Sequence, residues 1–339
     1  MSQGRTYVTA DIHGDPGFIS KAPADCAAII IAGDIGANRP QITTSKSLLA
    51  IVSQFYGMTS KTGATGNGFS SPEQAEGRLR FALTQICRSE FRNISDLVDI
   101  ATVRGEGPFP APVTSATYFS YLASQSPLLA KWFQDQSTRD NTALLDQIGK
   151  LWGDTPVVLV KGNGDYRSIL GYTVGSPNEW DREIPADFDP ILDPLWEKVQ
   201  ALGWTIVDEE PLYLPSIDAT LLGEGWFRWA QQLLDASTNA DDRILAKVRI
   251  VESTPLASKL ITHYPPLFGD EWYEDPSHSS DKPNQLTRAF GKIVNLVLNT
   301  RGRGFSQHIC GHLHAPVDQV ETRYGAEVNI LGRGSLFKI

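Results

Sequence analysis

Five apolar runs of this chain each end at a short polar motif, and this pattern constrains the fold more than any other feature of the sequence. Short unbroken apolar runs are typical of strands that are buried on both faces of a parallel sheet. Open α/β sheets place their ligands at the carboxyl ends of such strands. The pattern therefore predicts an α/β core with its functional groups gathered at one edge. The five motifs are Asp11-Ile12-His13-Gly14 after residues 7–10, Gly33-Asp34 after 27–32, Gly162-Asn163-Gly164-Asp165 after 157–160, His263 after 260–262, and Gly311-His312-Leu313-His314 after 309–310.

Residues 41–150 have a different character and are predicted to be a mostly helical insertion. Ser71-Pro72-Glu73-Gln74 combines an N-cap serine, a proline at the first helical position and a glutamine at the third. An apolar stripe at 144–152 has helical spacing and stops at Gly153. We therefore expect residues 1–40 and 151–339 to form the α/β core, with the insertion as a cap or lid of the same domain. Because the insertion follows Asp34, it could restrict large substrates.

The C-terminal half is predicted to alternate helices and strands. Apolar periodicity favours helices near 190–202, 226–236, 240–251 and 284–299. Hairpin-like strands are expected near 204–224 and 316–338. The segment 264–283, which holds paired prolines and several acidic residues, is expected to be an exposed loop.

Composition argues against several classes of protein. The formal net charge of −9 counts against a broad nucleic-acid surface, so a phosphate ligand would need local positive charge. No stretch approaches the roughly 20 apolar residues of a membrane span, and the first motif comes too early to leave room for a secretory signal. Cys26, Cys87 and Cys310 are unevenly spaced and lie in apolar runs, as expected of reduced core cysteines. We therefore expect a cytoplasmic protein.

The residue types in the five motifs are those of a two-metal hydrolase site. Two divalent cations about 3.5–4 Å apart can clamp the attacking and leaving oxygens of an in-line displacement. Such a site needs carboxylates, imidazoles and usually one ligand that both ions share. Asp11 and His13 are two apart on a strand continuation, so we expect them to point to the same side and hold one ion. His312 and His314 have the same spacing and could each serve a different ion.

Asp34 and Asn163 complete the candidate ligand set. Asp34 can bridge two ions, and Asn163 offers a neutral carbonyl oxygen. Two dications and two carboxylates leave a charge of about +2, which attracts phosphate and lowers the pKa of a bridging water towards neutrality. Histidine and carboxylate ligands suit Mn²⁺, which we favour, as well as Fe, Zn²⁺, Co²⁺ or Ni²⁺.

In chain order the motifs read Asp-x-His, Gly-Asp, Gly-Asn-x-Asp, His and Gly-His-x-His, and this order resembles the calcineurin-like metallophosphoesterase superfamily. The resemblance implies a four-layer αββα fold, a double β-sandwich flanked by helices. It implies that a hydroxide between two metals attacks phosphorus, with Asp34 and Asn163 as catalytic residues. It also implies one metal held by Asp11, His13, Asp34 and His314, and a second held by Asp34, Asn163, His263 and His312.

The chain departs from the family's pattern at Gly164. Most members have a histidine there, which is thought to protonate the leaving group or hold the phosphate. Asp165 would normally orient that histidine; here it could instead hydrogen-bond to a ligand or cap the backbone. General-acid help is worth about 10²–10⁴-fold, and its absence matters least when the leaving group is acidic. The departure therefore favours a phosphodiester or phosphoanhydride substrate over a simple monoester.

Several other residues could have a role in the site or a purely structural one. Tyr264 could touch substrate or simply pack, and Arg39 could lie near the phosphate. His278 could replace the missing acid, although its polar neighbours favour a solvated loop histidine, whereas His308 lies in a strand that favours a core role. The arginines at 78–92 could bind phosphates, but nearby acids favour a solvated helix face. The scattered tryptophans favour core packing rather than a stacking platform for bases.

These observations together predict a metal-dependent phosphoric ester hydrolase, with phosphodiester or phosphoanhydride hydrolysis favoured. The expected partner is a small phosphate-containing substrate, such as a nucleotide, and neither a membrane nor a nucleic acid is expected. Three alternatives stay open: a phosphomonoesterase for proteins or small molecules, a nuclease, and a metal-loaded scaffold that has lost catalysis at Gly164. The acidic charge balance counts against the nuclease.

Overall fold

The structure, a computed structural model, describes residues 4–37, 127–166, 192–274, 285–300, 304–315 and 318–339. The chain divides into two compact units, and most of the described residues belong to the first. The first unit comprises Met1–Gly36, Asn141–Tyr166 and Trp196–Ile339, and the second comprises Ala37–Asp140 and Arg167–Leu195. The predicted helical insertion at 41–150 falls largely outside the described residues and stays a prediction.

The first sheet has five strands in the order β11-β1-β2-β3-β4. The runs predicted at 7–10, 27–32 and 157–160 form three neighbouring parallel strands of it, which confirms that part of the prediction. The strands are β1 (Arg5–Thr9), β2 (Cys26–Ala32), β3 (Val157–Val160), β4 (Thr205–Val207), which is parallel to β3, and β11 (Phe337–Lys338), which is antiparallel to β1.

The second sheet has six strands in the order β5-β6-β7-β8-β10-β9. Its four central strands β6, β7, β8 and β10 run parallel, and β5 and β9 pair antiparallel at the two edges. The strands are β5 (Leu212–Leu214), β6 (Ala219–Leu222), β7 (Lys259–Thr262), β8 (Gln307–Ala315), β9 (Gln319–Arg323) and β10 (Ala326–Gly332). The fold is therefore mixed α/β, with two mixed sheets.

One buried apolar cluster draws side chains from both sheets. Each of its members is at most 2 % exposed, so burial on this scale supplies the main stabilisation of the unit. The first sheet contributes Val8, Ile30, Ala32, Val160 and Val207, together with Ala10 just after β1, and the second contributes Ala219, Leu221, Ile261, Ile309 and Leu331.

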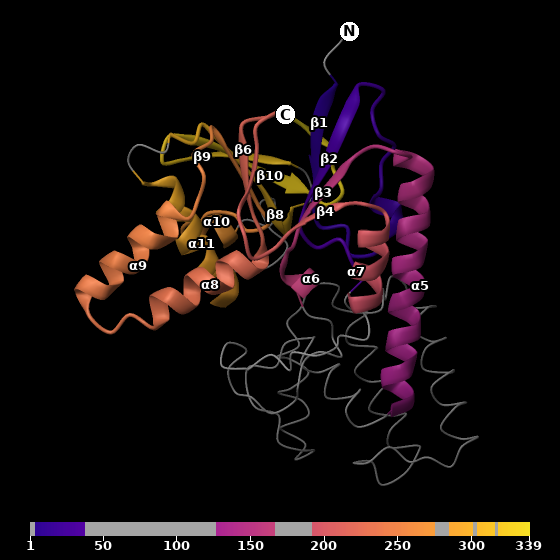
Figure 1. Cartoon of the computed structure of the whole chain (residues 1–339), viewed down its shortest axis with the longest axis horizontal. Coiled ribbons are helices and arrows are strands. Elements are labelled where there is room, and N and C mark those ends of the chain that lie inside the picture. Colours follow the sequence, from indigo (N-terminus) through magenta and orange to yellow (C-terminus); the bar gives the residue numbers. More distant parts are fainter. Residues whose placement is uncertain (1–3, 38–126, 167–191, 275–284, 301–303, 316–317) are drawn as a thin grey trace. The chain divides into compact units, whose positions relative to one another are not determined.

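The four helices predicted in the C-terminal half are confirmed with small shifts of their ends, and Figure 1 shows α8 to α11 gathered beside the second sheet. Helix α5 ends at Trp152, and Gly153 follows with φ 56°, as its predicted role as a stop requires. None of the described helices combines the length and apolar character that a bilayer crossing needs. The helices are η1 (Pro16–Phe18), α5 (Pro127–Trp152), α6 (Asn163–Tyr166), α7 (Leu192–Ala201), α8 (Glu224–Asp235), α9 (Ala240–Glu252), α10 (Asp270–Glu274) and α11 (Gln285–Leu298).

The expectation of an exposed loop at 264–283 is wrong for its first part. Tyr264 and Phe268 are buried, and residues 270–274 form α10. Phe268 packs in a second apolar cluster with Cys310 and Leu313, so this segment covers β8 instead of projecting into solvent. The prolines and acids signal a turn in the sequence, but they do not reveal that its aromatic residues have partners in the core.

Candidate metal centre

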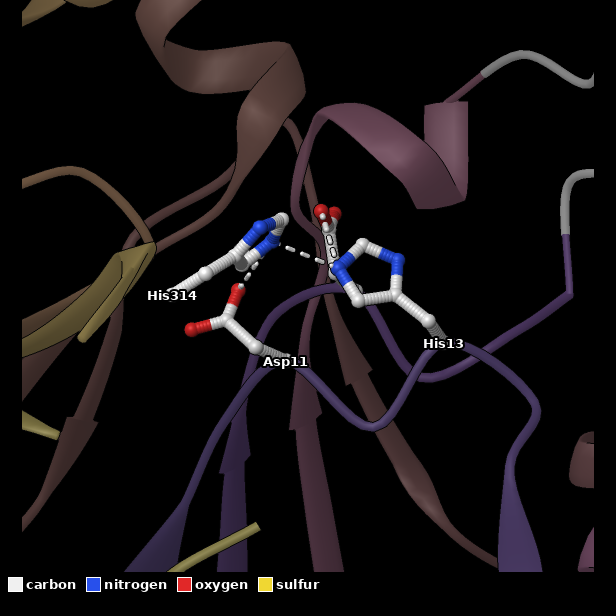
Figure 2. A group of neighbouring side chains, drawn as sticks. Asp11, His13 and His314 are labelled. Atoms are coloured by element: carbon white, nitrogen blue, oxygen red, sulfur yellow. Dashed lines mark hydrogen bonds and ion pairs between the residues drawn. The ribbon is translucent and has the colours of Figure 1, made fainter. Parts of the chain in front are cut away.

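The parallel strands of both sheets end at a common cluster of carboxylates and imidazoles. Asp11, His13, Asp34 and His314 each place one potential ligand atom so that all four atoms lie within 4.8 Å of one another. Figure 2 shows Asp11 and His13, from the segment after β1, pointing toward His314 of β8. Asp11 and Asp34 are fully buried, and the two histidines are partly exposed. A cluster of these residue types can hold a metal ion.

The distances in this first half of the site lie just below and just above those expected between ligand atoms that share an ion. His13 Nε2 lies 2.8 Å from His314 Nε2 and 3.6 Å from Asp34 Oδ2, and His314 Nε2 lies 3.7 Å from Asp11 Oδ1. Metal–nitrogen bonds of about 2.0–2.1 Å place two ligands of one ion roughly 3–3.5 Å apart. The donor atoms therefore converge on one point, as a cation requires.

A second set of donors meets at His263. Its Nε2 lies 3.0 Å from Asn163 Oδ1, 3.1 Å from His312 Nδ1 and 3.5 Å from Asp34 Oδ2. Its Nδ1 lies 3.0 Å from the carbonyl oxygen of Ala32, which can only accept a hydrogen bond. The neutral ring must therefore carry its proton on Nδ1 and present the lone pair of Nε2 to the site, which is the form that a metal binds.

His312 is oriented from its outer side by Thr287 of α11. The Thr287 hydroxyl lies 2.7 Å from His312 Nε2, and this leaves Nδ1 directed at His263. The side chains of Asp34, Asn163, His263 and His312 thus lie close together. They are the four residues that the family resemblance implies as ligands of a second metal. All seven predicted ligands are thus brought together, in two groups that share Asp34.

Burial and the neighbouring charges shift the pKa values of the carboxylates and imidazoles in the cluster. Burial raises the pKa of Asp34, but His263 and His13 outweigh it and hold the pKa well below its usual range. Burial lowers the pKa of His263, yet Asp34 and Asp11 raise it to about 10. Burial raises the pKa of Asp11, assisted by Asp34 and opposed by His314 and His263. In the metal-free protein, a proton on His263 balances the buried carboxylates, and bound cations would supply that positive charge instead.

The backbone at the site is left-handed at five candidate ligands. Seven described non-glycine residues have positive φ, and five of them are candidate ligands. Such conformations cost of order 1–3 kcal/mol each and gather at functional sites. The five ligands are Asp11 at 57°, His13 at 51°, Asp34 at 54°, His312 at 73° and His314 at 48°.

Asp11 and His13 were predicted to share a side because they continue an extended strand, and this reason is wrong. Asp11 and His13 do not continue β1 as an extended strand. On β8, the five steps from Cys310 to Ala315 pair with only two steps on β10, from Ile330 to Gly332, so the Gly311–His314 segment bulges. Bulges of this kind re-aim side chains beside active sites.

Three glycines let the ligand loops approach closely. A Cβ atom on Gly33 would lie 2.3 Å from His263 Nδ1, and one on Gly162 would lie 2.4 Å from Asp34 Oδ1. A Cβ atom on Gly311 would lie 2.6 Å from Asp11 Oδ2. These glycines are the first residues of their motifs because the ligands occupy the space that a side chain would need.

Asp165 caps the backbone of the two loops that carry Asp34 and Asn163. Its carboxylate accepts hydrogen bonds from the backbone N–H groups of Asp34, Ile35, Gly36 and Gly162, at 2.6–3.2 Å. Of the two roles open to it from the sequence, the capping role is the one found. Burial, followed by repulsion from Asp34, raises the pKa of Asp165 to about 7.

The structure also places several of the other candidate residues. His308 is fully buried beside the Thr262 hydroxyl at 2.9 Å, and burial lowers its pKa to about 3, so its core role is confirmed. Tyr264 is fully buried and packs against the rings of His263 and His312. Cys26 and Cys310 are free thiols. Cys87, Arg39, His278 and the arginines at 78–92 lie outside the described residues.

Two further charged residues, which were not predicted from the sequence, lie at the same edge. Glu224 follows β6 and is fully buried, with Tyr264 Oη donating to its Oε2 and Arg228 Nη2 2.8 Å from its Oε1. Arg333 follows β10 and donates from Nε to the Asp11 carbonyl oxygen at 3.0 Å. Both come after an apolar run and a glycine, which is the signal that located the other motifs.

Comparison with known proteins leaves the family undetermined. No protein-family model matches the chain, and no curated protein matches it. Among solved structures, the chain is similar to phosphopantetheinyl hydrolase (PptH) from Mycobacterium tuberculosis, with a TM-score of 0.38 and 10% identity over 100% of this chain and 96% of that chain. A TM-score of this size does not establish a common fold.

Proposed function

We propose that this protein is a metal-dependent phosphoesterase that hydrolyses a phosphodiester or phosphoanhydride bond in a small substrate. The observation that carries the proposal is the convergence of Asp11, His13, Asp34 and His314 within 4.8 Å, with Asn163, His263 and His312 alongside. Hard carboxylate oxygens mixed with imidazoles suit Mn²⁺, Fe, Co²⁺, Ni²⁺ or Zn²⁺, and we favour two Mn²⁺ ions.

The donor set fits cations by its own chemistry. His13 Nε2 and His314 Nε2 face each other at 2.8 Å, and two ring nitrogens at that distance need a cation or a shared proton between them. Divalent ions held here would lower the pKa of a bound water and neutralise phosphate charge. Asp34, with its lowered pKa, stays ionised and is placed to serve both groups of donors, while Asn163 adds no charge. The excess positive charge then favours an anionic substrate.

We also propose that the protein has the fold of the calcineurin-like metallophosphoesterases. The order of the motifs resembles the calcineurin-like metallophosphoesterases, and a core shared by two sheets with helices beside them is compatible with their four-layer αββα arrangement. Gly164 supplies a backbone N–H to Asp34 Oδ1 at 2.7 Å and has no side chain to act as an acid. A diester or anhydride with an acidic leaving group needs such an acid least.

Elemental analysis and a substrate panel test this function. Protein reconstituted with Mn²⁺ should hold near-stoichiometric metal and cleave aryl phosphodiesters, cyclic nucleotides or dinucleotide pyrophosphates faster than aryl monoesters. Asp34→Asn should abolish turnover. The hydrolase proposal fails if no divalent ion binds, and a binding scaffold replaces it if metal binds but none of these substrates is cleaved.

A further inference from the structure

Arg228 lies beside the Asn163 half of the candidate site. Its Cζ atom is 3.9 Å from the centroid of the Tyr166 ring. Tyr166 ends α6, the helical turn that begins at Asn163, and residues three apart on a helix project from neighbouring positions of one face. The guanidinium is therefore stacked on the same turn of helix that carries a candidate ligand and Gly164.

A second anchor holds Arg228 from the side of the sheet. Its Nη2 lies 2.8 Å from Glu224 Oε1, and the other Glu224 oxygen accepts a hydrogen bond from Tyr264. The Tyr264 ring centroid lies 4.8 Å from that of His312 and 5.2 Å from that of His263. Glu224 and Tyr264 are fully buried, whereas 28% of the Arg228 side chain is exposed. The arginine is thus fixed against this half of the site and is still accessible to a ligand.

The chemistry at Gly164 indicates what such a cation would bind. Attack by water forms one P–O bond and breaks the bond to the leaving group, which takes the electron pair, and the water proton passes to solvent. An alkoxide leaving group is about as basic as hydroxide, whose conjugate acid has a pKa of about 15.7. A phosphate monoester has a second pKa of about 6 and departs as a dianion without an acid. A site whose position 164 offers no side-chain acid is therefore suited to a phosphate leaving group.

We propose that Arg228 binds this anionic leaving group and that the substrate is a phosphoanhydride, such as a dinucleotide pyrophosphate. The inference rests on the proposed function and narrows its substrate class. A guanidinium can grip a phosphate with two parallel N–H donors, which a lysine cannot do. Arg228 is thus a substrate-binding residue that selects leaving groups by charge.

Binding of two phosphonates to Mn²⁺-loaded protein tests the inference without turnover. Methylenediphosphonate carries a second anionic group that methylphosphonate lacks. Arg228→Met should weaken methylenediphosphonate binding by about tenfold and methylphosphonate binding by less than threefold in calorimetry, with Mn²⁺ content unchanged. Arg228→Lys should be intermediate, and it replaces Arg228→Met in the test if the methionine variant does not fold. Equal losses for the two ligands, or no loss, would overturn the inference.

Arg323→Met is the matched control. Arg323 also lies over an aromatic ring, that of Phe268 at 4.9 Å, but it pairs with Ala326 at the end of β9 and β10 remote from Gly332. This variant should bind both phosphonates as the unsubstituted protein does. Turnover separates the two proposals. If aryl diesters are hydrolysed but Arg228→Met does not discriminate between the two phosphonates, the hydrolase proposal stands and this inference is rejected. If the variant discriminates but no substrate is hydrolysed, Arg228 binds an anion and the hydrolase proposal is rejected.

Discussion

The Asp165 carboxylate accepts a hydrogen bond from the backbone N–H of Asp34 at 2.6 Å, although 130 residues separate them. The same carboxylate accepts from Gly162 N–H at 3.0 Å, and so ties the loop of the shared ligand to the loop of Asn163. Asp165 thus supports the geometry of the site through the main chain.

Asp165→Asn should lower both stability and metal affinity. An amide keeps one acceptor oxygen, but its NH₂ group faces backbone donors that a carboxylate oxygen now satisfies. Hydrogen bonds to buried charged groups are worth about 1.5–3 kcal/mol each, so we expect a loss on the order of 3 kcal/mol in urea unfolding at a pH above the Asp165 pKa of about 7. Asp154→Asn, at an exposed turn, should change neither quantity. An unchanged Mn²⁺ affinity in Asp165→Asn would show that the loops hold their positions without it.

Gly162→Ala should impair the site through steric conflict alone. The new Cβ atom would lie 2.4 Å from Asp34 Oδ1 and 2.8 Å from the His263 ring, so one ligand must move. Gly149→Ala is the matched control, because a Cβ there meets nothing within 4 Å and alanine favours helix α5 by about 0.5–1 kcal/mol. Metal titration should show weaker binding only for Gly162→Ala, and equal affinities in both variants would contradict this account of the glycine.

Thr287→Val should weaken metal binding without removing a ligand. The hydroxyl lies 2.7 Å from His312 Nε2 and fixes the ring orientation, and loss of such a partner typically costs about 10–100-fold in affinity. Thr220→Val removes a similar buried hydroxyl, which donates to the Pro255 carbonyl, and should reduce stability but not metal affinity. Thr287→Ser should restore binding. A serine variant as weak as the valine variant would point to packing rather than the hydrogen bond.

The metal-free protein should lose stability as the pH rises from 7 to 10. The pKa of His263 is about 10 in the folded protein, above its ordinary value of 6.5, so the folded state holds a proton that the unfolded chain has released. The free energy of unfolding should therefore fall across this interval, by at most about 1.4 kcal/mol per pH unit. Urea unfolding in the presence of a chelator measures the slope.

Two comparisons check the origin of this slope. Metal-saturated protein should show a much flatter dependence, because the ion needs the unprotonated ring. His263→Asn should reduce the dependence of the unfolding free energy on pH in the metal-free protein. If the metal-free protein became more stable between pH 7 and 10, the prediction that folded His263 holds a proton in this interval would be contradicted.

Below pH 7, Asp165 has an effect of the same sign. Its pKa is raised to about 7 in the folded protein, so the free energy of unfolding should fall as the pH rises from about 4 to 7.

The strands and the polar motifs were predictable from the sequence because their signals are local. Apolar runs such as residues 27–32 predict buried strands, and the polar residue after each run marks the carboxyl edge, because both depend on neighbouring residues alone. The same rule could have found Glu224 and Arg333. It failed at Tyr264 and Phe268, whose burial depends on contacts with α8, α11 and β8.

The sequence by itself determined which donor atoms this protein has and that each stands at or near the end of a strand. Only the tertiary structure decided how they meet: left-handed backbone at Asp11 and Asp34, a bulge that turns His312 and His314, and the four backbone bonds of Asp165. The reason is physical. Strand position is set by short-range hydrophobic pattern, whereas the strained conformations persist only because segments more than a hundred residues apart in the chain pack against one another and hold them.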